Sequence, residues 1–387
     1  MIDVLVSGAG PAGTVAAIVL ARAGVRVRVL DRARFPRDKL CGDTVNPGAM
    51  AILGRLGLAH VTAGGLPVHG MIVTDGSGVR CAGRYPVDVE GRALRRCALD
   101  AALVGAARRE GVEIDEGVLV QEPEVAHGRV VGLRVRHPCG RDLCVPARIV
   151  IAADGAASRL ARALHLSSHA RRPRRWAVGA YFSDVAAEGE TGLPTSGFGR
   201  TVFGEMHIRR GRYIGIAPMP GGLTNACVVT GDRLALRDPA TLLESTLRAD
   251  PLLRARFADA RLLSRPVCLG PLAVANARAS APGLLLAGDA AGFVDPMTGD
   301  GLRFAFKGAE LAARSTLAML DRRVPLDNDT SLDRARAREF AVKWRFNRVL
   351  RSLVGSPAAV RVAGAGANAA PWILERLIHF AGDVGRR

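Results

Sequence analysis

The chain has 387 residues, 49% of them hydrophobic, so it can bury a large core in two or three domains or in one composite α/β unit. A net charge of +18 would ordinarily suggest a nucleic-acid partner, but only three of the 54 basic residues are lysines (Lys39, Lys307 and Lys343). Such an arginine excess is typical of a GC-rich genome, and aromatic residues make up only 4% of the chain, so nucleic-acid binding is not expected.

The seven cysteines are scattered and include no C-x-x-C pair, so neither a disulfide framework nor a metal site is predicted. The N-terminal sequence MIDVLVSGAG has no basic region and no cleavage site, and no apolar run approaches the length of a membrane span. We therefore expect a cytoplasmic protein that begins with a strand.

The first thirty residues predict a strand, a glycine loop, a helix and a second strand. Gly8, Gly10 and Gly13 form G-x-G-x-x-G around Pro11 and Ala12, and Asp31 ends the second strand 18 residues after the third glycine, close to the expected ~20. The glycines permit a tight turn, a close approach to a pyrophosphate and close packing of the helix, whose N-terminus faces the phosphates. Asp31 can accept ribose hydroxyls and would repel a 2′-phosphate. The pattern favours a dinucleotide site over an ordinary buried βαβ turn.

Two later stretches end a buried strand in an acid next to a glycine. The strand at 148–152 is followed by Asp154-Gly155, and the strand at 284–287 is followed by Gly288-Asp289. A loop that contains Pro296 then leads to Gly299-Asp300-Gly301, which opens a long helix from about Leu302. An acid at such a position can hold a sugar-alcohol chain, and a glycine-rich helix start can hold negative charge.

Four ordered motifs make the chain resemble the flavoprotein monooxygenase and geranylgeranyl reductase superfamily, which has the p-hydroxybenzoate hydroxylase fold. They are the fingerprint at 8–13, an R-x-x-L-D helix at 96–100, the Asp-Gly motif at 154–159 and the Gly-Asp motif at 288–302. The resemblance implies FAD as cofactor. It also implies an α/β (α+β composite) fold with a Rossmann-like FAD-binding domain, an inserted antiparallel-sheet substrate domain and C-terminal helices.

On this basis the FAD-binding domain is expected to comprise 1–70, 91–175 and 270–330, and the substrate domain 71–90 and 176–269. The segment 331–387 would be helical, 190–200 a mobile loop, and the glycines at 364–371 a loop between helices. No second G-x-G-x-x-G follows a strand. NADH or NADPH, the expected reductant, would then react at the flavin without a domain of its own.

The resemblance implies that Asp31 binds the adenosine ribose, Arg96 contacts the cofactor, Val120 lies by the adenine and Asp289 binds the ribityl chain. The predicted cofactor-binding residues are Gly8, Gly10, Pro11, Ala12, Gly13, Asp31, Arg32, Arg37, Lys39, Cys41, Gly42, Arg96, Val120, Asp154, Gly288, Asp289, Gly299, Asp300, Gly301 and Leu302. A hydrophobic small-molecule substrate would lie beneath the antiparallel sheet. Its candidate wall residues, each of which could equally be plain sheet core, are Tyr181, Phe203, Met206, Tyr213 and Met219.

The loop FPRDKLCGDTVNP at 35–47 resembles the geranylgeranyl reductase branch through F-P-R-x-K-x-C-G. Lys39 suggests a need for a compact ammonium group in a chain that uses arginine almost everywhere. Cys41 either faces the reactive side of the flavin or is a small buried hydrophobe. Halogenases of this fold typically carry a G-E-S-type sequence here and a later W-x-W-x-I-P element, and their absence from this sequence disfavours halogenation.

The sequence favours the first of three functions. The first is a monooxygenase that hydroxylates an aromatic, phenolic or polyketide-type natural product in secondary metabolism through a flavin C4a-hydroperoxide, with Pro296 and Thr298 beside the peroxide. The second is a geranylgeranyl-reductase-like enzyme that saturates isoprenoid double bonds, with Cys41 as the proton source. The third is a prenyl-binding relative without activity or FAD, against which the intact motifs argue. Basic helices at 331–354 and 371–380 could also approach anionic lipid.

Overall fold

The computed structural model describes residues 2–76, 78–169, 174–186, 201–276, 278–321, 330–354 and 371–384. The loop expected at 190–200 lies outside these ranges, as do residues 364–370 of the expected glycine loop. No helix within these ranges combines the length and the apolar character needed to cross a bilayer.

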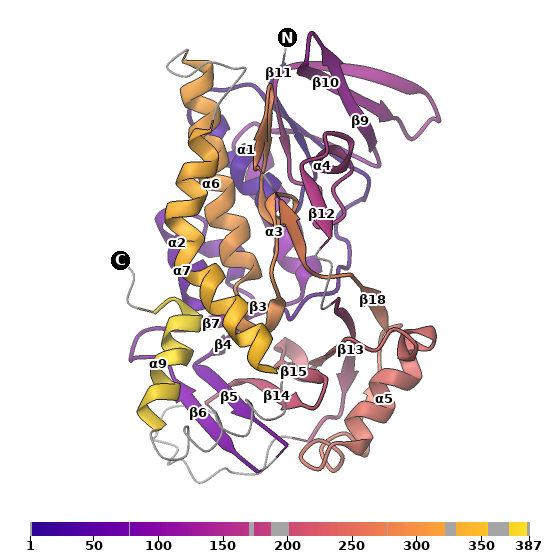
Figure 1. Ribbon diagram of the computed structural model, residues 1–387, viewed down its shortest axis with the longest axis vertical. Helices are drawn as coiled ribbons and strands as arrows, with labels where there is room; N and C mark the ends of the chain where they lie inside the picture. Colours follow the sequence, from indigo (N-terminus) through magenta and orange to yellow (C-terminus); the bar gives the residue numbers. More distant parts are fainter. Residues whose placement is uncertain are drawn as a thin grey trace.

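A mostly parallel sheet forms the upper part of the molecule in Figure 1. Its parallel strands lie in the order β21 (Leu284–Leu286), β11 (Asp142–Ala152), β1 (Ile2–Ser7), β2 (Val27–Asp31) and β8 (Glu113–Glu116), with β20 (Ser280–Ala281) antiparallel at one edge. β9 (Leu119–Ala126) and β10 (Arg129–Arg136) extend the first half of β11 as an antiparallel ribbon. Three helices, α1 (Pro11–Arg22), α3 (Arg96–Arg109) and α6 (Gly301–Leu320), pack with it around one core.

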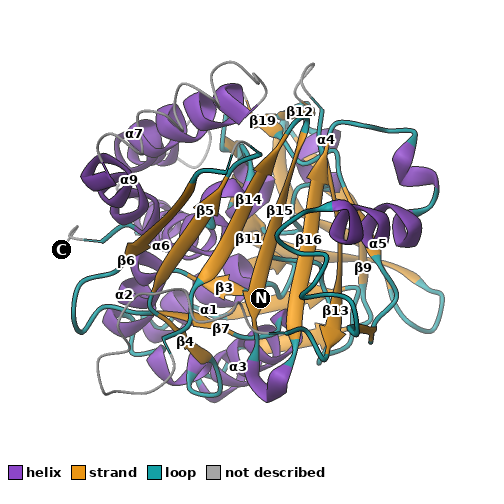
Figure 2. Cartoon of the chain, turned by 90° about the horizontal axis from the view of Figure 1, so that it is seen from below, coloured by secondary structure: helices purple, strands orange, loops and turns teal. Residues whose placement is uncertain are grey.

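A second large sheet, seen in front in Figure 2, has the order β17 (Arg261–Leu262), β13 (Trp176–Ser183), β16 (Thr224–Thr230), β15 (Arg212–Pro218), β14 (Gly204–Arg209), β5 (Gly70–Thr74) and β6 (Arg80–Arg84). β18 (Val267–Leu269) also pairs with β13. The sheet was predicted to be antiparallel, but β5 and β14 run parallel. The β5–β6 hairpin comes from an earlier part of the chain and is not joined to β14 by a tight turn, so nothing forces it to be antiparallel.

Successive residues of this sheet face opposite sides. Val178, Phe182 and Ile214 pack against α5 (Pro239–Ala249) on one face. Met206 and Tyr213 face the other way, toward Met297 and the glycine motifs. The fold thus places one face of the sheet over the carboxyl ends of the parallel strands.

Smaller elements join the two sheets. They are the strands β3 (Thr44–Val45), β7 (Gly91–Ala93) and β4 (Leu66–Val68), the pair β12 (Ser167–His169) and β19 (Val274–Asn276), and the helices α2 (Pro47–Arg55) and α4 (Arg159–Ala163). Two single turns, η4 (Gly288–Ala291) and η5 (Pro296–Thr298), follow β21. The helix α7 (Ser331–Val354) lies along α6, and α9 (Pro371–Gly382) lies beside β6 (Figures 1 and 2). The predicted α/β composite fold is therefore confirmed.

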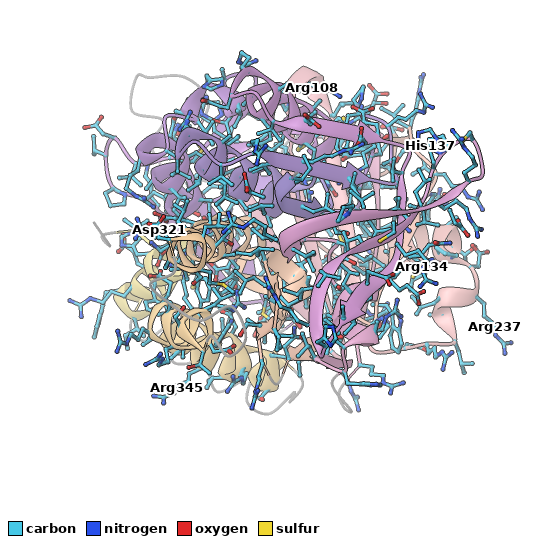
Figure 3. The ribbon with its side chains drawn as sticks, turned by 90° about the horizontal axis from the view of Figure 1, so that it is seen from above. Arg108, Arg134, His137, Arg237, Asp321 and Arg345 are labelled. Carbon is cyan, nitrogen blue, oxygen red and sulfur yellow. The ribbon has the colours of Figure 1, made fainter. Side chains whose placement is uncertain are left out.

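Charged side chains cover the outer surface. Figure 3 shows several of them pointing away from the body, among them Arg108, Arg134 and Arg345. The positive charge of these three arginines is therefore available to solvent.

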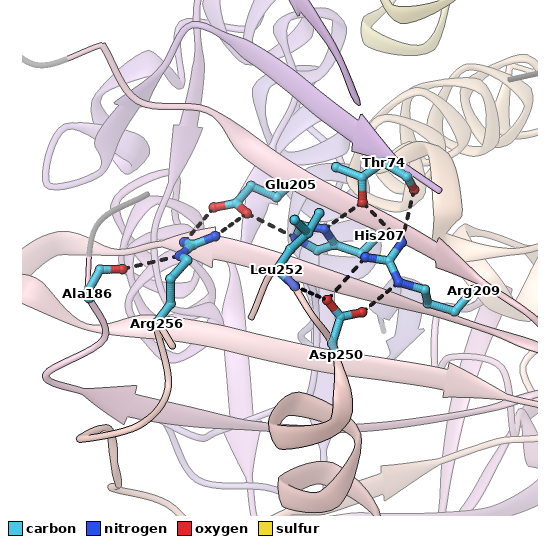
Figure 4. Close-up of polar contacts among 8 residues, drawn as sticks. All are labelled: Thr74, Ala186, Glu205, His207, Arg209, Asp250, Leu252 and Arg256. Atoms are coloured by element: carbon cyan, nitrogen blue, oxygen red, sulfur yellow. Dashed lines mark hydrogen bonds and ion pairs between the residues drawn. The ribbon is translucent and has the colours of Figure 1, made fainter. Parts of the chain in front are cut away.

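A buried polar network ties β14 to the α5 side of the second sheet (Figure 4). Glu205 accepts hydrogen bonds of 2.6 and 2.8 Å from the Arg256 guanidinium and lies 3.0 Å from His207 Nε2. On the same face, Arg209 pairs with Asp250 at 2.6 Å. The neighbours Met206 and Ile208 face the opposite side, so this network fixes the strand without occupying its inner surface.

Candidate cofactor and substrate site

Glycine is sterically required at two positions of the loop between β1 and α1. Gly8 has a φ of +100°, and a Cβ placed on it would lie 2.6 Å from the carbonyl oxygen of Ala153. A Cβ on Gly13 would lie 1.8 Å from the carbonyl oxygen of Gly8. At Gly10 the nearest atom to an added Cβ is Arg37 Nη2, 3.6 Å away, so this side of the loop faces a cation. Pro11 then begins α1, whose first N–H groups have no acceptor within the helix.

Asp31 joins the end of β2 to the glycine loop. Its two oxygens accept hydrogen bonds from the backbone N–H groups of Ala9 (2.7 Å) and Ala33 (2.8 Å). A carboxylate has about four lone-pair sites, so it can also accept ribose hydroxyls. Beside it, Arg32 is exposed, while Val120 is buried in the core of the parallel sheet.

The glycine motifs meet at one place. A Cβ on Gly288 would lie 2.7 Å from the Cβ of Ala12 at the start of α1, and Gly8 contacts Ala153 after β11. A Cβ on Gly155 would lie 3.7 Å from Lys39 Nζ. The carboxyl ends of β1, β11 and β21 thus converge with the loop at 35–47, where open α/β sheets bind their ligands.

Three cations gather at this junction. The Arg96 guanidinium donates to both oxygens of Asp100, at 2.9 Å each, and Arg37 Nη1 lies 3.0 Å from the same carboxylate. Burial and the nearby Arg96 lower the pKa of Lys39, and Asp289 opposes this effect. These cations lie beside the start of α1, an arrangement that suits a pyrophosphate. The residues present therefore fit the cofactor that the resemblance implied.

The remaining predicted cofactor residues lie after β11, in the loop at 35–47 and at the start of α6. Asp154 Oδ2 accepts a hydrogen bond from the N–H of Arg159 at the start of α4, and burial raises the pKa of this carboxyl. Gly42 is exposed in the loop, and Leu302 is buried in the core. Gly301 begins α6 after Gly299, whose φ is +66°.

Asp300 has a use that the sequence did not indicate. Its Oδ1 accepts a 3.1 Å hydrogen bond from Asn46 Nδ2 and lies 3.3 Å from Lys343 Nζ in α7. Burial raises the pKa of Asp300, and Lys343 opposes this. Since Asn46 also caps α2, this carboxylate connects the loop at 35–47 with the C-terminal helices. Because the side chain of Asp300 is already bonded, the predicted contact with a cofactor would be made by its backbone at the start of α6.

Asp43, which sequence reasoning missed, joins the loop to the second sheet. It accepts hydrogen bonds from the Arg96 N–H (3.1 Å), the Tyr181 hydroxyl (2.6 Å) and Asn225 Nδ2 (2.6 Å). Burial raises the pKa of Asp43 to about 6, and the bonds from Tyr181 and Asn225 oppose the rise. The sequence signal that could have identified Asp43 was its position two residues after Cys41.

Cys41 lies at the centre of this arrangement. Asn225 Nδ2 donates a 2.8 Å hydrogen bond to its carbonyl oxygen, and the Arg96 guanidinium lies near its sulfur. Burial raises the pKa of the Cys41 thiol. Burial together with the nearby Cys41 raises the pKa of Cys227, in β16, to about 12. Both thiols therefore hold their protons at neutral pH.

The inner face of the sheet has room beside Cys227. Gly179 and Gly215 flank it on the neighbouring strands. A Cβ on Gly179 would meet Leu40 of the loop at 2.7 Å, whereas a Cβ on Gly215 would meet nothing nearer than the Cys227 carbonyl oxygen at 4.0 Å. An apolar substrate group could contact the sheet at Gly215.

The five candidate wall residues are not brought together. Met206 and Tyr213 share an apolar cluster with Met297 of η5, but the Tyr213 hydroxyl is already bonded to Asp295 at 2.6 Å. Met219 belongs to a different cluster, against β4 and β7. The two others also lie apart, since Phe203 packs on Gly70 at the start of β5 and Tyr181 is bonded to Asp43.

The turn η5 contains the candidates Pro296 and Thr298, and Asp295 caps it by accepting from the Met297 N–H at 3.2 Å. Opposite η5, Asn347 of α7 is 2% exposed, and neither of its amide atoms has a hydrogen-bond partner among the described residues. The sequence signal that was missed is a polar face of α7, where Lys343, Asn347 and Arg351 lie at four-residue spacing. The described residues include no group of three side chains suited to a metal ion.

The chain matches the family model described as "FAD binding domain" over residues 1–325. Menaquinone reductase of Mycolicibacterium smegmatis is 32% identical over 80% of this chain and 75% of that protein. Digeranylgeranylglycerophospholipid reductase 2 of Methanopyrus kandleri is 30% identical over 85% and 79%. Conditioned medium factor receptor 1 of Dictyostelium discoideum is 27% identical over 83% of this chain, which spans 64% of that protein.

Solved structures share the fold. The flavin-dependent brominase Bmp2 superposes with a TM-score of 0.83 at 20% identity, covering 99% of this chain and 94% of that one. A geranylgeranyl bacteriochlorophyll reductase-like protein from Thermoplasma acidophilum superposes with a TM-score of 0.77 at 20% identity, covering 98% and 91%. Identities this low show a common fold and do not distinguish between activities.

Proposed function

Because this chain belongs to the FAD binding domain family and is an FAD-dependent oxidoreductase, we propose that it is a reductase that saturates a carbon–carbon double bond of an isoprenoid lipid. Two relatives at 30% identity or more support this assignment, since they are named as reductases of menaquinone and of a digeranylgeranyl lipid. We also propose NADH or NADPH as the reductant.

The observation that carries the proposal is the environment of Cys41. Saturating a double bond requires a hydride for one carbon and a proton for the other, and bound reduced FAD supplies the hydride. The protein must supply the proton, and burial keeps the Cys41 thiol protonated at neutral pH. The nearby Arg96 guanidinium, whose charge lowers the pKa of the Cys41 thiol against the effect of burial, would stabilise the thiolate that remains after the transfer.

The test uses the FAD-loaded protein reduced with dithionite in the absence of oxygen and supplied with menaquinone or with digeranylgeranylglycerophospholipid. After the quinone ring has been reoxidised in air, we expect a product whose isoprenoid chain has gained two hydrogen atoms. Cys41→Ser should retain FAD and lower the rate by roughly 10²–10⁴-fold, the usual contribution of a positioned acid. Cys268→Ser, at an exposed position, is the matched control and should change nothing.

A monooxygenase is the second candidate. The apolar surroundings of Met297, between Pro296 and Thr298, favour it, because oxygen transfer requires a site that excludes water. A product that forms only with oxygen and contains label from ¹⁸O₂ would establish hydroxylation and exclude the reductase. Purified protein that stays colourless and does not take up FAD would exclude both and leave a prenyl-binding protein.

A further inference from the structure

The C-terminal helices present a basic and apolar outer surface. Along α7, four arginines are exposed at helical spacing, and Val342 (51% exposed) and Val349 (58%) lie among them. The arginines are Arg334, Arg338, Arg345 and Arg348. Within the described part of the chain, none of them forms an ion pair. Figure 3 shows Arg345 directed away from the body of the molecule.

The acids of α7 do not neutralise this surface, because they face inward. Asp333 accepts a 2.6 Å hydrogen bond from the N–H of Ala279, and Glu339 pairs with Arg303 at 2.8 Å. The outer side of the helix is therefore positive along most of its length.

The neighbouring helix α9 adds large apolar side chains. Trp372 is 57% exposed, Ile373 44% and Leu377 38%, and the Arg376 guanidinium lies 5.2 Å from the centre of the Trp372 ring. Such side chains ordinarily cover a core. Here they lie next to the positive surface of α7, since the rings of Phe346 in α7 and Phe380 in α9 are in contact, with 4.8 Å between their centres (Figure 2).

We propose that the outer faces of α7 and α9, called here the C-terminal surface, dock on a lipid bilayer that contains anionic phospholipid. Arginines contribute attraction to the negative headgroups, while Trp372, Ile373 and Leu377 enter the boundary between headgroups and acyl chains. An acidic macromolecule such as a nucleic acid would need the arginines but not the exposed aliphatic side chains, so the combination favours a bilayer.

The inner side of α7 would bring the docked surface close to the site. Lys343 contacts Asp300 at the start of α6, and Arg351 Nη1 donates to the Val294 carbonyl oxygen at 3.1 Å, just before η5. One helix, about 10 Å across, therefore separates the bilayer from the segment 294–300. An apolar substrate could pass from the bilayer to the site over a short distance.

The test is co-sedimentation of the full FAD-loaded chain with vesicles of phosphatidylcholine, either alone or mixed with phosphatidylglycerol. We expect binding to the mixed vesicles that weakens as salt is added. Changing Arg334, Arg338, Arg345 and Arg348 to Gln should reduce this binding by roughly 100-fold or more, since each basic residue near an anionic surface contributes about fivefold. The matched control changes the exposed Arg233, Arg237, Arg248 and Arg254 to Gln, which removes the same charge elsewhere and should leave binding nearly unchanged.

Trp372 provides a second readout, which distinguishes insertion of side chains into the bilayer from binding by charge alone. Brominated acyl chains should quench part of the tryptophan fluorescence of the bound protein, and Trp372→Phe should abolish that quenching. The proposal is overturned if mixed vesicles are not bound or if the two quadruple variants lose binding equally. It is also overturned if Trp372 is not quenched, because binding would then rest on charge and an acidic macromolecule would be the better partner.

Discussion

The hydroxyl of Tyr181 in β13 donates a 2.6 Å hydrogen bond to Asp43, a buried carboxyl 138 residues earlier in the sequence. This bond joins the loop at 35–47 to the sheet above it. Burial raises the pKa of Asp43 to about 6, so the folded state retains a proton that the unfolded chain loses near pH 4. The stability of the protein should therefore fall as the pH rises from about 4 to 6, by about 3 kcal/mol from this group.

Tyr181→Phe should raise the pKa of Asp43 further, because it removes a donor to the charged form. The loss of stability should then be larger at pH 8 than at pH 5, and the window in which stability falls should extend above pH 6. Urea unfolding at several pH values measures this. Tyr85→Phe, which also truncates a buried tyrosine, should cost the same at both pH values. Equal costs for Tyr181→Phe would contradict the predicted coupling.

Gly13→Ala should abolish FAD binding and destabilise the protein. The added Cβ would lie 1.8 Å from the Gly8 carbonyl oxygen, and that backbone atom can yield only if α1 moves off β1. Gly54→Ala in α2 is the control, since its Cβ meets nothing within 4 Å and Ala is favoured over Gly within a helix by up to about 1 kcal/mol. Flavin absorbance and the melting temperature report both effects. A Gly13→Ala protein that remained yellow would show that the loop can move away.

Lys39→Met should change FAD binding and stability in opposite directions. Burial and Arg96 lower the pKa of Lys39, so its charge is unfavourable in the protein without cofactor, which should be as stable or more stable after the change. Loss of one charge-assisted contact to the cofactor, worth about 1.5–3 kcal/mol, should weaken FAD binding by roughly 10–100-fold. Lys307→Met, at a half-buried position on α6, should leave FAD affinity unchanged. Titration of the apoprotein with FAD measures these affinities. An unchanged FAD affinity for Lys39→Met would show that Lys39 does not contact the cofactor.

The pair formed by Lys343 and Asp300 should be strongly coupled. Lys343 is fully buried 3.3 Å from Asp300, so Lys343→Met leaves a buried carboxylate without its cation and should cost about 3–5 kcal/mol. The double variant with Asp300→Asn should cost less than the sum of the two single changes. A double-mutant cycle measured by denaturant unfolding tests this, and additive costs would contradict it. Arg248→Gln, which breaks an exposed pair with Glu244, should cost less than about 1 kcal/mol.

Local patterns allowed much of this molecule to be predicted from its sequence. The fingerprint at 8–13, the acid–glycine strand ends and the long helices depend on neighbouring residues, and the predicted fold and FAD binding family are confirmed. The assignment of individual residues to the cofactor and the boundaries of the domains stay predictions.

Contacts between segments far apart in the sequence could not be predicted from such local patterns. The bond from Asn225 to Asp43 spans 182 residues, and the bond from Asn46 to Asp300 spans 254. No spacing rule in a single sequence relates such positions. Of the candidate wall residues, Met206 and Tyr213 share one apolar cluster and Met219 lies in another, because alternation along a strand shows that two residues share a face but not what lies opposite each of them.

The alternation of faces in β14 also bears on how this enzyme can change over evolutionary time. His207 and Glu205 hold the strand to β5 and to Arg256 from the outer side, while Met206, between them, packs against the inner apolar cluster. Replacements at the inner position can therefore accumulate while the anchoring side chains keep the strand in register. Variation of the interior and preservation of the architecture thus fall on alternate residues of one strand.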